Sequence, residues 1–199
     1  DLETIESRGR LETEEASISK RAMERGMKSL GTLGSGNHFL ELQTVSDVVD
    51  EATAKQWGLF EDQVVAMIHS GSRGLGHQVC TDHVRKLEAS YTNEGGRWVN
   101  EQWGYELPDR QLASAPIHSR EGMAYLDAMN AAANFAFANR SVLAHRLRTV
   151  LKLEMGVDGE ATTLYDVAHN IAKIETHNVH GRQCNCVVHR KGATRSFDA

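Results

Sequence analysis

The chain has 199 residues, of which 40% are hydrophobic and 25% are charged, and its formal net charge is −5 at pH 7. These proportions are typical of a globular protein with a hydrophobic core, so they exclude the disordered and fibrous classes. No apolar run approaches the roughly 20 residues that a membrane-spanning helix needs. The negative charge excludes a surface that is basic throughout, so any contact with nucleic acid must be a local patch.

The use of cysteine and histidine sets the next expectations. Three cysteines, Cys80, Cys184 and Cys186, are an odd number in a chain of this length and argue against a disulfide framework. We therefore expect a reducing compartment and a cytoplasmic location. The ten histidines are the unusual feature, because histidine can act as a general base, a nucleophile or a metal ligand near neutral pH. The sequence starts with Asp1 and carries neither a starting Met nor a signal peptide, so we expect a piece of a longer protein.

In the first part of the chain, hydrophobic periodicity predicts two helices and two strands. Residues 12–29 carry apolar side chains at helical spacing. A glycine-rich stretch over 31–38 leads into 39–43, where alternating apolar and polar residues indicate a strand. A short helix is expected over 47–57, and the continuous apolar run at 64–68 is typical of a buried strand.

The middle of the chain predicts two helices separated by a long connection. We expect a helix over 77–90 and then an ordered surface excursion over 91–117, where Asn, Gly, Pro and charged residues dominate. Ser119 is typical of the N-cap of a long helix, which the alanine-rich sequence predicts near 120–153.

The last part of the chain is less clear in its periodicity. Residues 163–176 fit either a helix or a strand. His180-Gly181-Arg182 predicts a hairpin turn that leads into a strand over 183–189. Taken together, the predicted elements indicate an α+β fold with mixed strands and flanking helices.

Glycines flank two polar residues at 34–38, Gly-Ser-Gly-Asn-His, where a predicted strand begins. Glycine lets the backbone take positive φ and approach a ligand closely, while Asn37 and His38 offer polar atoms. No Gly-Lys-Ser/Thr follows, which excludes a phosphate-binding P-loop. Glu41 lies three residues after His38, so strand alternation places the two side chains on opposite faces. An ordinary glycine turn capped by Asn37 is the alternative.

A second glycine-rich loop, His-Ser-Gly-Ser-Arg-Gly-Leu-Gly at 69–76, joins the apolar strand to the helix that follows. This order gathers backbone N–H groups at a helix N-terminus, where an anion can bind. Arg73 adds a guanidinium that can hold two phosphate oxygens, and His69 lies where the strand ends. The alternative is a tight strand-to-helix turn with a solvated arginine.

A third segment, Asp-Val-Ala-His-Asn at 166–170, interrupts an otherwise apolar stretch with an acid and a His-Asn pair. A single histidine in such a place is usually a hydrogen-bonded core residue. Three histidines at the edges of predicted elements, His38, His69 and His169, together match the demand of a transition-metal site.

Two groups of polar residues lie near the end of the chain. Three cations in His-Arg-Lys-Gly-Ala-Thr-Arg at 189–195 favour a local grip on phosphate, with a solvated basic turn as the alternative. His177, His180, Cys184 and Cys186 are spaced somewhat like a zinc site. Because the two cysteines would share one face of a strand and zinc loops use a longer spacing, we interpret this group as two buried cysteines and two surface histidines.

Four of these segments occur in the order in which the RtcB family carries them, and the chain resembles that family over most of its length. The matching segments, with the smaller matches at 25–26 and 128–140, are Leu30–Glu41, 69–76, 166–173 and 189–195. RtcB proteins are manganese- and GTP-dependent RNA ligases that join a 3′-phosphate or 2′,3′-cyclic phosphate end to a 5′-hydroxyl end. The resemblance implies a single RtcB-like domain over residues 1–199.

The resemblance also implies a role for ten residues. It implies that the ligands of manganese, two ions in the family, are His38, His69 and His169. It implies that the contacts to GTP are made by Asn37, Glu41 and Asn170. It implies that RNA or nucleotide phosphates are held by Arg25, Arg73, Lys191 and Arg195. In such a site a metal clamps triphosphate oxygens while arginines fix the RNA end.

Two family motifs have no match in this chain. One is an upstream Asp-x-Gly-Cys-Gly, which supplies a cysteine and an aspartate to the metals. The other is a downstream His-Gly-x-Gly-Arg, which carries the histidine that takes GMP covalently. We therefore expect the central portion of an RtcB-like catalytic domain, with no nucleophile of its own and no ligase activity alone.

In the complete enzyme, the resemblance implies that GMP passes from GTP to a histidine and then to the RNA 3′-phosphate, before the 5′-hydroxyl displaces it. Two other functions stay open. One is a metal-dependent phosphohydrolase that uses the same histidines, and the other is a non-catalytic remnant that binds RNA or a nucleotide.

Overall fold

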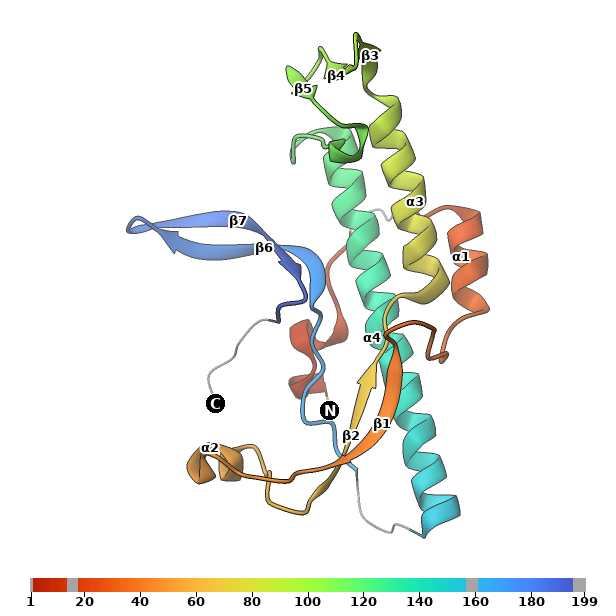
Figure 1. Cartoon of the computed structure of the whole chain (residues 1–199), viewed down its shortest axis with the longest axis vertical. Helices are drawn as coiled ribbons and strands as arrows, with labels where there is room; N and C mark the ends of the chain where they lie inside the picture. The colour runs from red at the N-terminus through yellow and green to blue at the C-terminus, as the bar shows by residue number, and fades with distance from the viewer. Residues whose placement is uncertain (1, 14–17, 157–160, 195–199) are drawn as a thin grey trace. The chain divides into compact units, whose positions relative to one another are not determined.

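A computed structural model of the chain describes residues 2–13, 18–156 and 161–194 (Figure 1). The described residues form two compact units. The first comprises those of 1–10, 30–71 and 136–199, and the second comprises those of 11–29 and 72–135. Helix α4 (Arg120–Met155) contributes its first part to the second unit and its remainder to the first. The single domain expected over 1–199 stays a prediction.

Two strands of the first unit place two of the predicted histidines side by side. Strand β1 (Phe39–Thr44) pairs antiparallel with β2 (Val64–His69), so that Phe39 lies opposite His69. His38 therefore precedes β1 at the end of the ribbon where β2 stops. The connection between them carries α2 (Glu51–Gln56), which Asp50 caps by accepting hydrogen bonds from the amides of Ala52 and Thr53.

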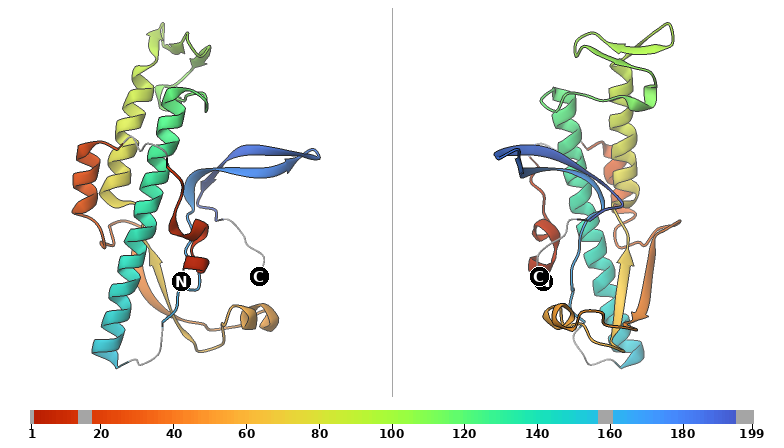
Figure 2. Two further views of the ribbon diagram at one scale, coloured as in Figure 1. Left: turned by 180° about the vertical axis from the view of Figure 1, so that it is seen from behind. Right: turned by 60° about the vertical axis from the view of Figure 1, so that its left-hand side comes forward.

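A long antiparallel hairpin completes the strands of the first unit (Figure 2). Its strands are β6 (Asn170–Val179) and β7 (Arg182–Lys191). The turn residues His180 and Gly181 have φ of +50° and +80°, as the tightest two-residue hairpin turns require. Asn170 lies opposite Lys191 at the other end of the hairpin.

The N-terminal segment of the first unit lies against the residues that precede β6. It contains two short 3-10 helices, η1 (Leu2–Thr4) and η2 (Glu6–Gly9). Between them, Ile5 forms a parallel bridge with Asp166. Two backbone hydrogen bonds connect the segments here: the amide of Glu6 donates to Asp166 O, and the amide of Asp166 donates to Thr4 O.

Helices dominate the second unit. Helix α1 (Lys20–Met27) packs against α3 (Arg73–Ala89). Their shared core is formed by Ala22, Val79 and Ala128, with Ile18 and Leu75 packed against it. Small side chains at this core let the helices approach closely. None of the helices in the described part of the chain is long and apolar enough to cross a membrane.

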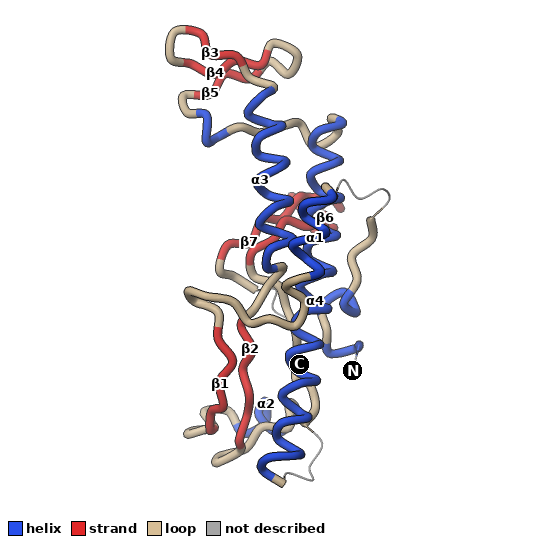
Figure 3. Tube along the Cα trace, turned by 90° about the vertical axis from the view of Figure 1, so that its right-hand side faces the viewer, coloured by secondary structure: helices blue, strands red, loops and turns tan. Residues whose placement is uncertain are grey.

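A small antiparallel sheet follows α3, drawn as short red segments in Figure 3. Its strands are β3 (Thr92–Glu94), β4 (Arg97–Asn100) and β5 (Tyr105–Leu107), and the 3-10 helix η3 (Arg110–Leu112) comes next. The buried side chain of Asn100 ties the sheet to the end of α3 by donating to Ser90 O.

Several predictions from the sequence are confirmed. The fold is α+β with one long helix, and α4 begins directly after Ser119, whose hydroxyl accepts from the amide of Gly122. The strands expected over 39–43 and 64–68 are β1 and β2, and the expected hairpin turn joins β6 to β7.

Other predictions are wrong in extent or burial. The helix expected over 12–29 begins at Lys20, because Ser19 is extended and its hydroxyl caps α1 by accepting from Ala22 N. The excursion over 91–117 contains a sheet. The apolar strand is not buried, since Val64 is 68% exposed and Met67 is 44% exposed. The reason is that β1 and β2 form a two-stranded ribbon, which leaves much of both faces open among the described residues.

Three boundaries also shift. Helix α2 begins at Glu51 rather than at 47, after its Asp50 cap. Helix α3 begins at Arg73 rather than at 77, so it includes the end of the glycine-rich loop. The segment 163–176 is a strand only from Asn170 onward.

Candidate functional site

Three segments of the first unit bring His38, His69 and His169 into one cluster. The ring centroids of His38 and His69 are 5.7 Å apart. Those of His69 and His169 are 4.9 Å apart, with the two rings nearly perpendicular. The Nε2 atoms of His69 and His169 lie 3.1 Å from each other. The sequence places each histidine at the edge of an element, and the fold gathers those edges.

Hydrogen bonding and burial set the states of two of these rings. Nδ1 of His38 lies 2.8 Å from the carbonyl oxygen of Ser35, so Nδ1 carries the proton that it donates and the ring is held in one orientation. Burial is the main cause that lowers the pKa of His169, and repulsion from His69, Arg140 and Lys191 acts in the same direction. His169 is therefore neutral at pH 7, which is the form that coordinates a metal.

The cluster agrees in kind with a transition-metal site. Imidazole nitrogens are donors that such ions accept, and a proton donated from Nδ1 to a carbonyl is the usual way to orient a ligating histidine. In the described ranges, however, no three His, Cys, Asp or Glu side chains are arranged so that they could hold an ion. Two of the three histidines make direct contact through Nε2, and the ring of His38 lies farther out.

The residues expected to contact GTP lie around this cluster. Asn37 and Glu41 are exposed next to His38, and Glu41 accepts a hydrogen bond of 2.6 Å from Gln43 on the same strand. Asn170 follows His169, and its Oδ1 accepts from the amide of Gly192 at 3.0 Å. These side chains share the first unit with the histidines and keep polar groups at its surface.

The basic segment at 189–195 is only partly available for phosphate. Arg190 forms a two-fold ion pair with Glu175, with N–O distances of 2.6 and 2.9 Å. Lys191 is exposed at the end of β7 opposite Asn170. Arg195 lies outside the described residues. The prediction of a grip by three cations is therefore wrong for Arg190, because a carboxylate of the hairpin itself binds it.

Arg25 and Arg73 belong to the second unit. Nη1 of Arg25 donates to Gln78 Oε1 at 2.9 Å. A Cβ added at Gly74 would lie 3.2 Å from Arg25 Cβ, so the glycine lets α1 approach the first turn of α3 at this point. Arg73 has φ of +47°, an unusual value for a residue with a side chain. The fold thus brings these two arginines to the same end of α3.

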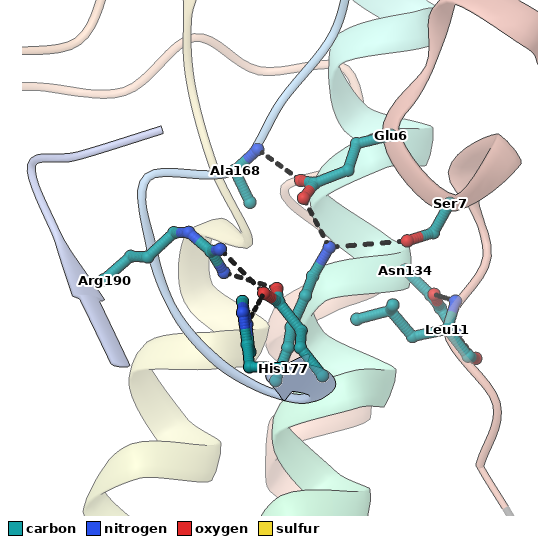
Figure 4. Close-up of polar contacts among 9 residues, drawn as sticks. Glu6, Ser7, Leu11, Asn134, Ala168, His177 and Arg190 are labelled. Carbon is teal, nitrogen blue, oxygen red and sulfur yellow. Dashed lines mark hydrogen bonds and ion pairs between the residues drawn. The ribbon is translucent and has the colours of Figure 1, made fainter. Parts of the chain in front are cut away.

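The His-Cys group near the hairpin turn has another arrangement than predicted. Figure 4 shows His177 and Arg190 on the same carboxylate, which belongs to Glu175. Cys184 and Cys186 are half-buried rather than buried, because β6 and β7 form a two-stranded sheet in the described part of the chain. His177 lies within β6 rather than in a turn, and only His180 occupies the turn itself.

Two residues of α4 that the sequence reasoning missed lie behind the histidine cluster. Asn139 is fully buried, and Arg140 forms a nearly buried ion pair with Asp166. In the sequence they end the segment 128–140, which resembles the family, but nothing in that alanine-rich helix singles out the Asn-Arg pair. Such a pair is ordinary on a solvated helix face, so composition alone could not have identified it.

The fold and this cluster define an α+β protein with an imidazole-lined site at the ends of its strands. Comparison with known proteins adds the family. The chain matches the model of the family described as tRNA-splicing ligase RtcB over residues 1–199. It therefore belongs to the RtcB family.

Curated relatives agree with this assignment. The chain is 51% identical to the RNA-splicing ligase RtcB of Mycobacterium bovis, over 99% of this chain and 43% of that protein. It is 49% identical to the tRNA-splicing ligase RtcB of Thermococcus kodakarensis, over 100% of this chain and 40% of that protein. It is 48% identical to the tRNA-splicing ligase RtcB of Pyrococcus furiosus, over 99% of this chain and 20% of that protein. The chain thus spans less than half the length of these relatives.

Proposed function

We propose that this chain forms part of an RNA ligase that joins an RNA 3′-phosphate or 2′,3′-cyclic phosphate end to a 5′-hydroxyl end and consumes GTP. The observation that carries the proposal is the cluster of His38, His69 and His169, drawn from three separate segments of an RtcB-family chain. Splicing of tRNA, named for the relatives, belongs to the same proposal.

In this proposal His38, His69 and His169 supply part of the ligands of manganese, and the cysteine and aspartate of the family's upstream motif complete the set. This division agrees with the finding that no three side chains of the described residues form a metal site by themselves. The bound ion would neutralise negative charge on phosphate oxygens. The chain's own contribution is to orient and prepare the rings: the carbonyl of Ser35 orients His38 by accepting its Nδ1 proton, and burial lowers the pKa of His169, which favours its neutral form. A fixed ring orientation and a neutral ring both favour coordination of a metal ion.

The guanine nucleotide would bind beside the histidines. Asn37 and Glu41 are exposed next to His38, and Asn170 is adjacent to His169. Because the amide of Gly192 fixes Oδ1 of Asn170, the NH₂ group of that side chain has a set orientation and can donate to an oxygen of the nucleotide.

Cationic side chains would hold the phosphates of the RNA ends. Lys191 lies opposite Asn170 in the first unit. Arg25 and Arg73 lie at one end of α3 in the second unit, where backbone N–H groups of the helix add to their attraction for anions. Arg195 completes the set that the family resemblance implies.

We assign the covalent step to a histidine outside these 199 residues. That histidine attacks the α-phosphate of GTP, so that a bond to GMP forms and pyrophosphate leaves. GMP then passes to the RNA 3′-phosphate, and the 5′-hydroxyl attacks that phosphate, forming the phosphodiester and releasing GMP. The residues of this chain bind and orient the phosphates and do not act as the nucleophile.

The test is covalent labelling with GTP that carries a label in its α-phosphate, in the presence of manganese. It compares this chain, the protein expressed from the complete reading frame, and the His69→Ala variant of that protein. We expect label on the complete protein, none on its variant and none on this chain. Release of product without enzyme-linked GMP would identify a phosphohydrolase instead. If the complete protein binds RNA but shows no covalent labelling and no turnover, it is a non-catalytic binding protein.

A further inference from the structure

One turn of α4 contacts all three segments that carry the clustered histidines. Asn139 and Arg140 are consecutive residues of this turn, and both belong to the first unit. Both lie at the end of the segment 128–140, which resembles the family but for which the sequence assigns no role to any single residue. Their partners are the loop before β1, the loop after β2 and the residues before β6.

Asn139 joins the first two of these loops. Its Oδ1 accepts from the amides of Gly31 and Thr32, at 2.6 and 3.2 Å. Its Nδ2 donates to Thr32 O, Ser70 Oγ and Gly71 O, at 3.1, 3.1 and 3.3 Å. The side chain is fully buried, so no water can take over these bonds. An amide is required, because only an amide offers both donors and an acceptor at this place.

Arg140 joins the second loop to the third segment. Its Nε donates to Asp166 Oδ1 at 2.6 Å, and its Nη1 donates to the carbonyl oxygen of Ser70 at 3.1 Å. Ser70 directly follows His69, and Asp166 precedes His169 by three residues. The guanidinium also lies over the ring of Phe137, 5.0 Å from its centroid. Lysine could not replace it, since a single ammonium lacks the fixed fork of donors.

We propose that Asn139 and Arg140 are positioning residues for the histidine cluster. Through Thr32, Ser70 and Asp166 they fix the distances between the three segments, and thereby the distances between the three rings. The consequence for manganese affinity rests on the proposed function above. The consequence for the arrangement of the rings does not depend on it.

The chain contains a matched control on the same helix. Asn134 also makes two hydrogen bonds to a loop, accepting from Leu11 N at 2.7 Å and donating to Leu11 O at 2.9 Å (Figure 4). Its loop carries no histidine of the cluster, and it belongs to the second unit. Replacing it removes the same chemical group from the same helix without touching the three segments.

The first measurement is the NMR spectrum of the imidazole nitrogens in the full chain without metal. We expect Asn139→Ala to shift the signals of His38 and His69 most, because it frees their two loops. Arg140→Lys should shift those of His69 and His169 and leave His38 in place. Asn134→Ala should shift none of the three. Equal shifts in Asn134→Ala and Asn139→Ala, or no shift in either, would overturn the proposal.

The second measurement is the affinity for Mn²⁺, determined from the EPR signal of the ion that stays unbound during a titration. Partners of metal ligands typically change affinity by about ten- to hundredfold, and we expect a loss of this size for Asn139→Ala and Arg140→Lys but not for Asn134→Ala. Unchanged affinity in the first two variants would contradict the proposal. If the parent chain binds no Mn²⁺ while the ring signals still shift as expected, the metal assignment fails and the positioning role stands.

Circular dichroism shows which variants fold, and only folded variants are compared. If Asn139→Ala does not fold, Arg140→Lys and Ser70→Ala take its place, because each removes only part of the network. The proposal would be supported if these variants shift the imidazole signals of His69 and of the rings that it contacts, His38 or His169, and leave the signals of the other histidines unchanged. Folded variants with the ring signals of the parent would overturn it.

Discussion

Nε2 of His69 lies 3.1 Å from Nε2 of His169, although the two residues are 100 positions apart in the chain. One of the two atoms must carry a proton and the other a lone pair, since neutral imidazoles pair in no other way. The contact exists because the end of β2 and the start of β6 meet in the first unit. It is the most direct geometric reason to regard these rings as one functional group.

Replacing His69 with alanine should remove Mn²⁺ binding and leave the fold largely intact. His69 is the central ring of the cluster, in contact with both His38 and His169. Because His69 is itself a ligand in the proposal, we expect a loss of affinity beyond the roughly ten- to hundredfold that is typical of the partners of ligands. EPR titration measures this loss, and the circular dichroism spectrum should be that of the parent. His77→Ala, an exposed histidine of α3 in the second unit, is the control. Survival of Mn²⁺ affinity in His69→Ala would refute the site.

Glu6→Gln should destabilise the first unit strongly. Glu6 accepts from the amide of Ala168 at 2.9 Å (Figure 4) and forms a 2.7 Å ion pair with Lys173, and both charged side chains are buried. The glutamine leaves Lys173 as a buried charge without its counterion, which costs about 3–5 kcal/mol. Urea unfolding measures the loss.

The control for that prediction is Glu3→Gln. Glu3 pairs with Arg8 on the surface at 3.1 Å, and an exposed pair contributes about 0–1 kcal/mol. Both glutamates belong to the N-terminal segment, so the comparison isolates burial. Equal losses in the two variants would show that the Glu6–Lys173 pair does not hold this segment against the residues before β6.

Stability should fall at low pH partly through Asp82. The hydrogen bond that Ser19 Oγ donates to it is the main cause that lowers the pKa of Asp82 below the usual 3.8, with Gln78 adding a second bond. Because the folded carboxyl binds its proton less readily than the unfolded one, its contribution is full above pH 3.8 and disappears as pH falls through the lowered pKa.

Asp82→Asn should therefore flatten the acid limb of the stability profile, measured as urea midpoints at a series of pH values. Ser19→Ala removes the main donor and should flatten the same limb in part. A profile of Asp82→Asn that runs parallel to that of the parent below pH 3.8 would rule out this contribution.

Arg73→Ala should weaken binding of RNA with a 3′-phosphate, most of all at low salt. Each contact between a cation and a single-stranded phosphate contributes about 0.7 to the slope of log affinity against log salt, so the slope should fall by that amount. Fluorescence anisotropy over a range of salt concentrations measures it. Arg97→Ala, an exposed arginine paired with Glu106 in the same unit, should leave the slope unchanged. An unchanged slope in Arg73→Ala would count against a phosphate contact.

Local patterns in the sequence were sufficient where one interaction decides the structure. The alternation at 39–43, the apolar run at 64–68 and the cap at Ser119 each predict an element that the fold contains. The glycine at 181 likewise predicts the hairpin turn. His38 and His69 lie at the edges of two of these elements, whereas the element next to His169 could not be assigned from periodicity.

Long-range packing decides what the sequence could not show. The strands over 92–107 consist largely of polar residues in short runs, so their pairing leaves no periodic signal. The exposure of β2 depends on which other elements pack against it, and the apolar sequence of β2 does not record this. The role of Asn139 depends on backbone groups 107 and 108 positions away in sequence, which no local pattern records.

The bonds that Asn139 accepts have a consequence for hydrogen exchange. Gly31 and Thr32 lie in a loop, where amide hydrogens normally exchange with solvent deuterium quickly. Their N–H groups donate to a fully buried side chain. These two amides should therefore exchange as slowly as those inside α4, and their protection measures how often the loop before β1 separates from that helix.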